Sequence, residues 1–330
     1  MDLGILKAIG NTPMVEVSVG DTHLMAKLEC MNPFGSMKDR AAKSTLLSLL
    51  CTNTINKDTT IVESSSGNFA IALSGVCSAL GLKCLCVVDS NITNANLQII
   101  KQFGSTIHQI DIPEKNQSNQ EKRIETVKKL LQTNNNMYWT NQYNNRLIQE
   151  SYFSLAEEIL SQYPQTETIY IPVSTCGTIS GVSTWIKKQN PQIEIIAVDS
   201  YGSQIFGERI ARNRFTGMGS RIKPGNLGNA IIDKVVRVSD LECIINCHKL
   251  LEQGLFIGAS SGAVLAAINK TKEFNRNIVA IFPDRGDRYL DNLYNNEWLK
   301  ENMPQLMSED YNSNHRVISA KIKLSQLREK

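Results

Sequence analysis

The feature that most constrains this chain is a regular alternation of short apolar segments with longer amphipathic ones. Each apolar segment is rich in β-branched residues and ends at turn-forming residues, as is typical of strands buried on both faces. The predicted strands are 60–64, 84–89, 106–111, 137–141, 168–174, 194–200, 234–240 and 278–284. The predicted helices are 41–52, 68–80, 92–103, 120–132, 146–162, 178–188, 240–253 and 261–274. This alternation predicts an α/β fold with parallel sheets covered by helices on both faces.

The length of the chain predicts more than one domain. A chain of 330 residues exceeds what a single hydrophobic core usually serves, and the predicted strands are numerous enough for two sheets. We therefore expect two domains, each doubly wound with three layers (αβα).

Composition and charge exclude several classes of partner. The hydrophobic fraction of 42% is ordinary, and a formal net charge of only +3 gives no argument for nucleic-acid or membrane binding. The N-terminal segment lacks the apolar core of a signal peptide, and no segment approaches transmembrane length. The cysteines lie mostly in apolar surroundings, as expected of buried thiols, and no second cysteine pair has the spacing of a metal finger. These features predict a cytoplasmic protein with no structural metal.

Small polar residues occur where ligands of open parallel sheets bind, after the strands. The sequence SSSGN at 64–68 leads into one apolar helix, and STCGTISG at 174–181 leads into another. Hydroxyls, glycine and free backbone N–H groups at a helix start suit an anion, and the second stretch suits a phosphate best. The alternative for each is an ordinary capped helix start. A third stretch, LFIGASSG at 255–262, is interpreted as a strand-like segment that enters a helix through serines.

One lysine stands at an unusual place in the stretch MNPFGSMKDR at 31–40. Ser36 and Asp39 form an S-x-x-D capping pattern, which puts Lys38 in the first turn of a helix. The helix dipole disfavours a cation there, which lowers the pKa of the amine and favours the neutral form that a Schiff-base lysine needs. The alternative is a lysine whose stem carries its charge out to water.

Together these segments resemble the cysteine synthase-like group of fold type II enzymes that depend on pyridoxal 5'-phosphate, whose fold is tryptophan synthase β-like. The resemblance extends from IGNTPMVEV at 9–17 to PDRGDRYLD at 283–291. It implies that Lys38 is the catalytic residue, which carries the cofactor and acts as general base. The cofactor-binding residues that it implies are Lys38, Asn68, Ser174, Thr175, Cys176, Gly177, Thr178 and Ser260. The substrate-binding residues that it implies are Ser65, Ser66, Gly67, Gln142, Gly217, Met218, Gly219 and Arg221.

The resemblance also implies an architecture and a reaction. A large cofactor-binding domain would span 1–40 and 145–330, and a small mobile domain at 41–144 would close on the substrate in a homodimer. A group would leave the β-carbon of an amino acid, and a nucleophile would add there. Ser260 at the pyridine nitrogen is a neutral partner, so we expect a less protonated ring that is a poorer electron sink.

Departures from the family pattern bear on the substrate. The phosphate motif of the family is usually richer in glycine, whereas here Ser174, Thr175 and Cys176 precede Gly177. In the carboxylate loop, Phe69 and Ala70 replace a Thr-Gly pair. Arg221 and Lys223 stand in a loop that is apolar in sulfide-using cysteine synthases, and such cations suit a phosphate leaving group or a dicarboxylate nucleophile. The alternative for these two residues is a solvated charged loop.

The segments 197–207 and 282–294 resemble the siderophore-pathway N-(2-amino-2-carboxyethyl)-L-glutamate synthases. Those enzymes join O-phospho-L-serine to L-glutamate, with phosphate release, on the route to 2,3-diaminopropionate. The alternatives are a cysteine synthase that uses O-acetylserine or O-phosphoserine with sulfide, a sulfide-releasing cysteine lyase, a serine or threonine dehydratase, and a catalytically silent homologue that serves as a binding or regulatory partner.

Overall fold

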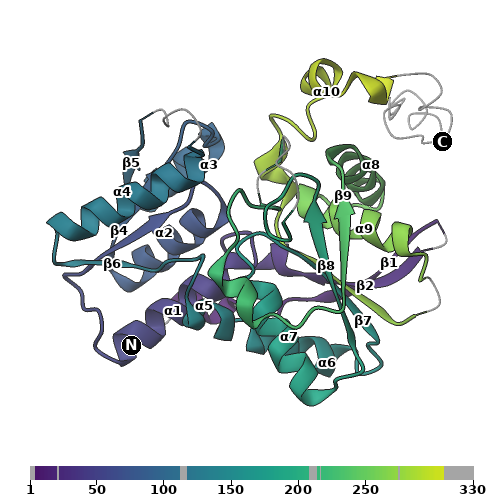
Figure 1. Ribbon diagram of the computed structural model, residues 1–330, viewed down its shortest axis with the longest axis horizontal. Coiled ribbons are helices and arrows are strands. Elements are labelled where there is room, and N and C mark those ends of the chain that lie inside the picture. Colours follow the sequence, from purple (N-terminus) through teal and green to yellow (C-terminus); the bar gives the residue numbers. More distant parts are fainter. Residues whose placement is uncertain are drawn as a thin grey trace, which may run out of the picture.

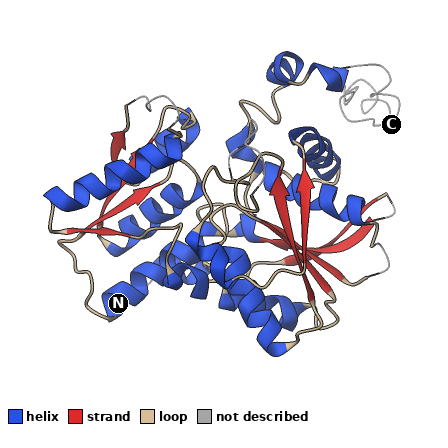
Figure 2. Cartoon of the chain, in the orientation of Figure 1, coloured by secondary structure: helices blue, strands red, loops and turns tan. Residues whose placement is uncertain are grey.

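Two β-sheets, each with helices packed against it, lie side by side in the computed structural model (Figures 1 and 2). The structure describes residues 4–20, 22–111, 117–207, 214–215, 217–273 and 276–307. Its strands are β1 (Met14–Val19), β2 (Thr22–Leu28), β3 (Thr60–Ser64), β4 (Lys83–Val88), β5 (Thr106–Gln109), β6 (Met137–Trp139), β7 (Thr168–Pro172), β8 (Glu194–Ser200), β9 (Lys234–Val238) and β10 (Ile278–Phe282). Its α-helices are α1 (Lys38–Cys51), α2 (Asn68–Leu80), α3 (Asn94–Gln102), α4 (Asn119–Thr133), α5 (Arg146–Glu150), α6 (Phe153–Gln162), α7 (Gly177–Gln189), α8 (Asp240–Leu251), α9 (Ala259–Thr271) and α10 (Asn296–Asn302).

The sheets differ in size and connectivity. The larger has six strands in the order β1-β2-β10-β7-β8-β9, and the smaller has four in the order β5-β4-β3-β6. Every pair is parallel except β1 with β2, which form an antiparallel hairpin at the edge of the larger sheet. The predicted α/β class with two sheets is therefore confirmed. No helix in the described part of the chain is long and apolar enough to cross a membrane.

Alternate residues of the strands bury both faces of each sheet, which is why these strands are continuously apolar. In β3, Ile61 packs into a cluster with α2, whereas Val62 joins a separate cluster with Val127 of α4. In β7, Ile169 packs toward α6 and α7, whereas Tyr170 packs toward α8 and α9. Both sheets are therefore the middle layer of a helix–sheet–helix sandwich.

Three local expectations are corrected by the structure. None of the predicted strands covers the β1–β2 hairpin. In the structure β2 pairs with β10, from the other end of the chain. The strand-like segment before Ser260 forms only an isolated bridge, between Ile257 and Arg285. The single helix predicted at 146–162 is divided into α5 and α6. Near this division α7 passes so close that a Cβ on Gly181 would lie 2.0 Å from the carbonyl oxygen of Gln149.

A buried ionic network fixes the start of α1, which packs against both α2 and α5. The guanidinium of Arg40 bonds both carboxylate oxygens of Glu29, at 2.7 and 2.8 Å, and both of Glu158, at 2.7 Å each. The ammonium of Lys27 adds a third ion pair, 2.7 Å from Glu158. Although burial acts to raise it, pairing with Arg40 holds the pKa of Glu158 at about 2. The network thus holds two positive and two negative side chains together at the first turn of α1, which also carries Lys38.

Candidate active site

The loop before α1 presents Lys38 at the first position of that helix, as the sequence predicts. The predicted capping pattern is wrong in detail, because the cap residue is Met37 and no side chain caps it. The hydroxyl of Ser36 accepts a hydrogen bond from the backbone N–H of Lys38 at 3.3 Å. The carboxylate of Asp39 reaches back to the backbone N–H of Phe34 at 2.7 Å. Asp39 therefore closes the preceding loop instead of completing a capping box.

The amine of Lys38 is poised to lose its proton. Burial lowers its pKa to about 8, and the charges of Cys176 and Asp284 oppose this shift only in part. No ion pair to this amine occurs among the described residues, so the lowered pKa is not offset by a salt bridge. A neutral amine is a nucleophile and a base, which an ordinary surface lysine is not at neutral pH.

The turn between β7 and α7 lies beside this lysine. Cys176 caps α7 in the left-handed region, with a φ of 59°, and burial raises the pKa of its thiol to about 12. The hydroxyl of Thr178 lies 3.9 Å from the sulfur of Met37, which ties the first turn of α7 to the start of α1. The hydroxyl of Ser174 donates to the carbonyl oxygen of Gly219 at 2.9 Å. The predicted anion site, residues 174–178, is therefore an open helix start next to Lys38.

The loop between β3 and α2 is organised by its own hydroxyls. Ser65 accepts hydrogen bonds from the backbone N–H groups of Gly67 and Ala70, at 3.4 and 3.3 Å. Ser66 accepts one from the backbone N–H of Asp89 at 3.1 Å and lies 3.2 Å from its carboxylate. These contacts hold the loop in one conformation with Gly67 as the cap of α2.

A buried carboxylate joins this loop to Gln142. Glu63, near the end of β3, accepts hydrogen bonds from the backbone N–H of Gln142 at 3.2 Å, the hydroxyl of Thr140 at 2.6 Å and the indole N–H of Trp139 at 3.1 Å. The side-chain amide of Gln142 donates to the carbonyl oxygen of Ser64 at 2.9 Å. Burial raises the pKa of Glu63 to about 7, although its donors favour the carboxylate form. The predicted substrate residue Gln142 therefore lies directly beside the serine loop.

Asn226 joins the two halves of the site and was not singled out from the sequence. Its side-chain amide donates to the carbonyl oxygens of Gln142 at 2.7 Å and Thr175 at 2.9 Å. Its oxygen accepts from the backbone N–H of Asn145 at 2.9 Å and from Gln149 at 3.0 Å. The sequence around it, PGNLGN, matches none of the motifs described above. Only the three-dimensional contacts reveal this role.

Ser260 and Asn68 meet at a residue that the sequence analysis also left unassigned. The side-chain amide of Asn68 donates to Asp284 at 2.7 Å, and the hydroxyl of Ser260 lies 3.4 Å from the same carboxylate. Asn68 begins α2 and Ser260 lies in the first turn of α9, so this contact joins the two sheets' helices. The two predicted cofactor residues are therefore neighbours, with Asp284 between them.

The loop at 217–221 borders the candidate site. Gly217 has a φ of 98° and approaches Tyr289, whose hydroxyl would lie 3.3 Å from a Cβ at that position. Gln120, in the first turn of α4, bonds the hydroxyl of Ser220 at 3.2 Å and accepts from the backbone N–H of Arg221 at 3.1 Å. Met218 is buried, whereas Arg221 is half-buried. The loop thus spans from the anion site to the smaller sheet's helices.

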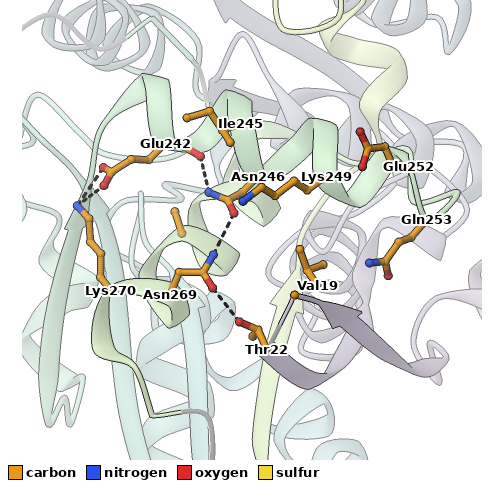
Figure 3. Close-up of a pocket in the computed structure, with 12 residues that line it drawn as sticks. Val19, Thr22, Glu242, Ile245, Asn246, Lys249, Glu252, Gln253, Asn269 and Lys270 are labelled. Carbon is orange, nitrogen blue, oxygen red and sulfur yellow. Dashed lines mark hydrogen bonds and ion pairs between the residues drawn. The ribbon is translucent and has the colours of Figure 1, made fainter. Parts of the chain in front are cut away.

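A separate hollow of about 700 Å³ lies away from these residues, between the β1–β2 hairpin, α8 and α9 (Figure 3). Its polar side chains bond one another: Thr22 donates to Asn269 at 2.8 Å, and Asn269 donates to Asn246 at 3.1 Å. None of the predicted site residues lines it. Among the described residues, no three His, Cys, Asp or Glu side chains are grouped as metal ligands.

One protein family accounts for this arrangement. Its family model, described as "Pyridoxal-phosphate dependent enzyme", matches residues 5–284. The chain belongs to this family. It is therefore an enzyme that depends on pyridoxal phosphate, as the resemblance implies.

Solved structures of this family are similar to the chain over most of its length. An O-acetylserine dependent cystathionine beta-synthase from Helicobacter pylori has 29% identity and a TM-score of 0.81, covering 87% of this chain and 97% of its own. A cysteine synthase from Entamoeba histolytica has 26% identity and a TM-score of 0.79, covering 88% and 90%. An O-ureido-L-serine synthase has 25% identity and a TM-score of 0.79, covering 92% and 98%. The chain is thus a cysteine synthase-like pyridoxal-phosphate enzyme of β-elimination and β-replacement.

The residues around Lys38 fit this cofactor. The amine of Lys38, whose pKa is about 8, lies next to the start of α7, whose N–H groups would suit the phosphate, and the hydroxyl of Ser260 would be available to the ring nitrogen. When bound, pyridoxal phosphate supplies an electron sink for the α-carbon of an amino acid. The chain would hold the cofactor and orient the amino acid, and Lys38 Nζ would be the group that moves protons.

Covalent attachment of the cofactor to the apoenzyme should depend on pH through Lys38. Because the pKa of this amine is lowered from 10.5 to about 8, its neutral form accumulates as the pH rises to about 8. The attachment rate should therefore increase about tenfold per pH unit below that value and then become constant. Stopped-flow absorbance of the Schiff base measures this rate. A rate that keeps increasing up to pH 10.5 would show that Lys38 behaves as an exposed lysine.

Proposed function

We propose that this enzyme is an N-(2-amino-2-carboxyethyl)-L-glutamate synthase, which joins O-phospho-L-serine to L-glutamate and releases phosphate. Its product would be a precursor of 2,3-diaminopropionate for siderophore biosynthesis. This reaction is a β-replacement in which O-phospho-L-serine loses phosphate and L-glutamate is the nucleophile. The observation that carries the proposal is the position of Arg221.

Arg221 offers a positive charge at the edge of the candidate site. No described acidic side chain forms an ion pair with its guanidinium, unlike Arg40 and Arg276, which are both paired. Its own backbone is held by Gln120, and the preceding residues reach the anion site through the bond from Ser174 to Gly219. A half-buried arginine without an acidic partner suits the phosphate of O-phosphoserine or the side-chain carboxylate of glutamate.

The other residues take the roles implied by their positions. We propose that Ser65, Ser66, Gly67 and Gln142 bind the α-carboxylate of the amino acid, because the helix dipole favours an anion at the start of α2. Lys38 Nζ would take the α-proton of the substrate as general base. Phosphate would then leave the β-carbon, and the amine of glutamate would add to it.

Domain closure is part of this proposal. The four-stranded sheet lies wholly within the predicted small domain, residues 41–144, and the six-stranded sheet lies within 1–40 and 145–330. Contacts from Gln120 to Ser220 and from Asn68 to Asp284 connect the two parts. We infer that the small domain closes through these contacts and excludes water from the reaction. We also propose a homodimer, for which light scattering is the test.

A second candidate is a sulfur-transferring enzyme that uses O-acetylserine. It is favoured by the solved neighbours, one of which is an O-acetylserine dependent cystathionine beta-synthase and another a cysteine synthase. The test is to supply the purified holoenzyme with O-phosphoserine and glutamate, and separately with O-acetylserine and sulfide. We expect phosphate release and an amine-linked adduct from the first pair. Cysteine from the second pair, with no phosphate release from the first, contradicts the proposal.

Replacing Arg221 with alanine tests the observation on which the proposal depends. A lost hydrogen bond to a charged group costs about 1.5–3 kcal/mol, so kcat/KM for O-phosphoserine or for glutamate should fall roughly 10-fold to 150-fold. The matched control is Lys223→Ala, because Lys223 is exposed in the same loop and should contribute little. Steady-state kinetics with both substrates varied identifies which one Arg221 binds. Equal activity of the Arg221→Ala variant and the wild type would contradict this role.

A further inference from the structure

The chain crosses from the four-stranded sheet to the six-stranded one between β6 and α5, and Asn226 binds this crossover at three points. Its backbone N–H donates to the carbonyl oxygen of Tyr143 at 3.0 Å. Its side chain donates to the carbonyl oxygen of Gln142 at 2.7 Å and accepts from the backbone N–H of Asn145 at 2.9 Å. Asn226 therefore holds the crossover segment, residues 142–145, at both of its ends.

The same residue contacts the start of α7 and the turn before it. Its side-chain amide donates to the carbonyl oxygen of Thr175 at 2.9 Å. The hydroxyl of Ser180, in the first turn of α7, donates to the backbone carbonyl oxygen of Asn226 at 2.6 Å. Asn226 is fully buried. It therefore bridges the crossover segment and the turn that is predicted to hold the cofactor phosphate.

The side-chain amide of Asn226 uses its whole hydrogen-bonding capacity. Its two N–H groups face the carbonyl oxygens of Gln142 and Thr175, and its oxygen accepts from Asn145 and from the side chain of Gln149 at 3.0 Å. An amide offers two donors and two acceptor lone pairs, so all four are matched. A carboxylate of the same size would set an oxygen against two carbonyl oxygens.

The backbone next to Asn226 packs directly against the crossover segment. A Cβ on Gly225 would lie 2.6 Å from the side-chain oxygen of Asn144. This separation is shorter than a van der Waals contact, so a side chain at 225 would push the two segments apart. The glycine thus allows the close approach on which the hydrogen bonds of Asn226 depend.

Both carbonyls that the Asn226 amide holds belong to peptide groups of the candidate site. Because a peptide group is planar and trans, its N–H points opposite to its C=O. Holding the oxygen of Thr175 therefore sets the direction of the N–H of Cys176, within the predicted phosphate turn. Holding the oxygen of Gln142, whose N–H donates to Glu63 at 3.2 Å, sets the backbone of Gln142 on both sides.

We propose that Asn226 is a positioning residue that couples the cofactor-phosphate turn at 174–178 to the substrate residue Gln142. It acts through Thr175 and Gln142 and needs no contact with the cofactor or the substrate. A phosphate that orders the turn then also orders Gln142, and an amino acid bound at Gln142 favours the ordered turn to the same extent. This inference rests on the roles proposed above for Gln142 and the turn, and is independent of which group leaves the β-carbon.

The test is Asn226→Asp, which keeps the size of the side chain and removes both donated hydrogen bonds. The amino-acid substrate is O-phosphoserine or O-acetylserine, whichever the wild-type holoenzyme uses. Its KM should rise roughly 5-fold to 150-fold, as is typical of coupling between two sites, while kcat changes much less. The ³¹P resonance of the bound cofactor, measured without substrate, should move toward that of free pyridoxal phosphate.

The matched control is Asn229→Asp, in the same short helical segment. Asn229 is exposed and donates to Gln149 at 2.8 Å, so this variant should keep the wild-type KM and ³¹P resonance. A double-mutant cycle with Gln142→Ala separates positioning from a general loss of structure. If Asn226 acts through Gln142, Asn226→Asp should raise KM little further in the Gln142→Ala background, whereas a general loss of structure would add in full.

A change in only one of the two quantities, KM or the ³¹P resonance, contradicts the coupling, and so does a change in neither. If Asn226→Asp does not fold, Ser180→Ala answers the question, because it removes only the hydroxyl that donates to Asn226. Its KM should rise roughly 2-fold to 10-fold with the same direction of ³¹P change, and wild-type values would contradict the inference. Turnover of O-acetylserine without phosphate release from O-phosphoserine contradicts the proposed function alone.

Discussion

Replacing Lys38 with alanine is expected to lower turnover by roughly 10²-fold to 10⁴-fold, and the cofactor should no longer be covalently bound. The amine with a pKa of about 8 is, in this account, both the attachment point and the general base. The measurement is phosphate release from O-phosphoserine, or cysteine formation if the second candidate is correct. Added small alkylamines should restore part of the activity, because they supply the missing base.

The matched control is Lys43→Ala, on the same helix. The ammonium of Lys43 donates to the carbonyl oxygen of Ile9 at 3.2 Å and has no place in the proposed site. This variant should keep the cofactor and nearly all of its turnover. Unchanged activity and absorbance of the Lys38→Ala variant would instead support a catalytically silent homologue.

Replacing Arg40 with methionine is expected to lower the free energy of unfolding by about 3–5 kcal/mol. The variant leaves the buried carboxylate of Glu29 and the half-buried carboxylate of Glu158 with only Lys27 as a positive partner. Removing one partner of a buried pair costs far more than the pair's net contribution, because an uncompensated charge remains. Chemical denaturation followed by circular dichroism measures the loss.

The control for this change is Arg146→Met, which breaks an exposed pair with Glu150. Arg146 has 86% of its side-chain surface exposed, so its loss should cost less than about 0.5 kcal/mol. Equal stability of the two variants would show that the network behind α1 does not stabilise the fold. The Arg40→Lys variant keeps the positive charge and loses the bidentate geometry. A loss of unfolding free energy smaller than that of Arg40→Met would measure what the charge alone contributes.

Much of the fold was predictable because each buried strand carries its own local pattern. Strands such as Thr60–Ser64 and Ile278–Phe282 are buried along nearly their whole length, which distinguishes them from surface segments. The β1–β2 hairpin was harder to predict, because its residues have no long apolar run and alternate between buried and exposed. Its place beside β10 depends on pairing between Met25 and Val279, which no local pattern contains.

The candidate site was predictable where a motif is short and continuous, and unpredictable where contacts cross the fold. Lys38 and the turn at 174–178 are each ambiguous in their own surroundings, and the role of both was predicted from the order of the motifs along the whole chain. Asn226 lies in no motif, and Asp284 lies in a segment that resembles the family but had no role assigned to it. Their places in the site come from four hydrogen bonds of Asn226 and three close donors to Asp284. The roles of all these residues remain predictions until they are tested in solution.

We propose that Lys38 holds the cofactor of this enzyme, and every role assigned above depends on it. Reduction of the holoenzyme with borohydride, followed by proteolysis and mass spectrometry, tests it most directly. We expect a pyridoxyl group on the peptide that contains Lys38 and on no other lysine. A modified lysine elsewhere, or none at all in protein that contains the cofactor, would contradict it.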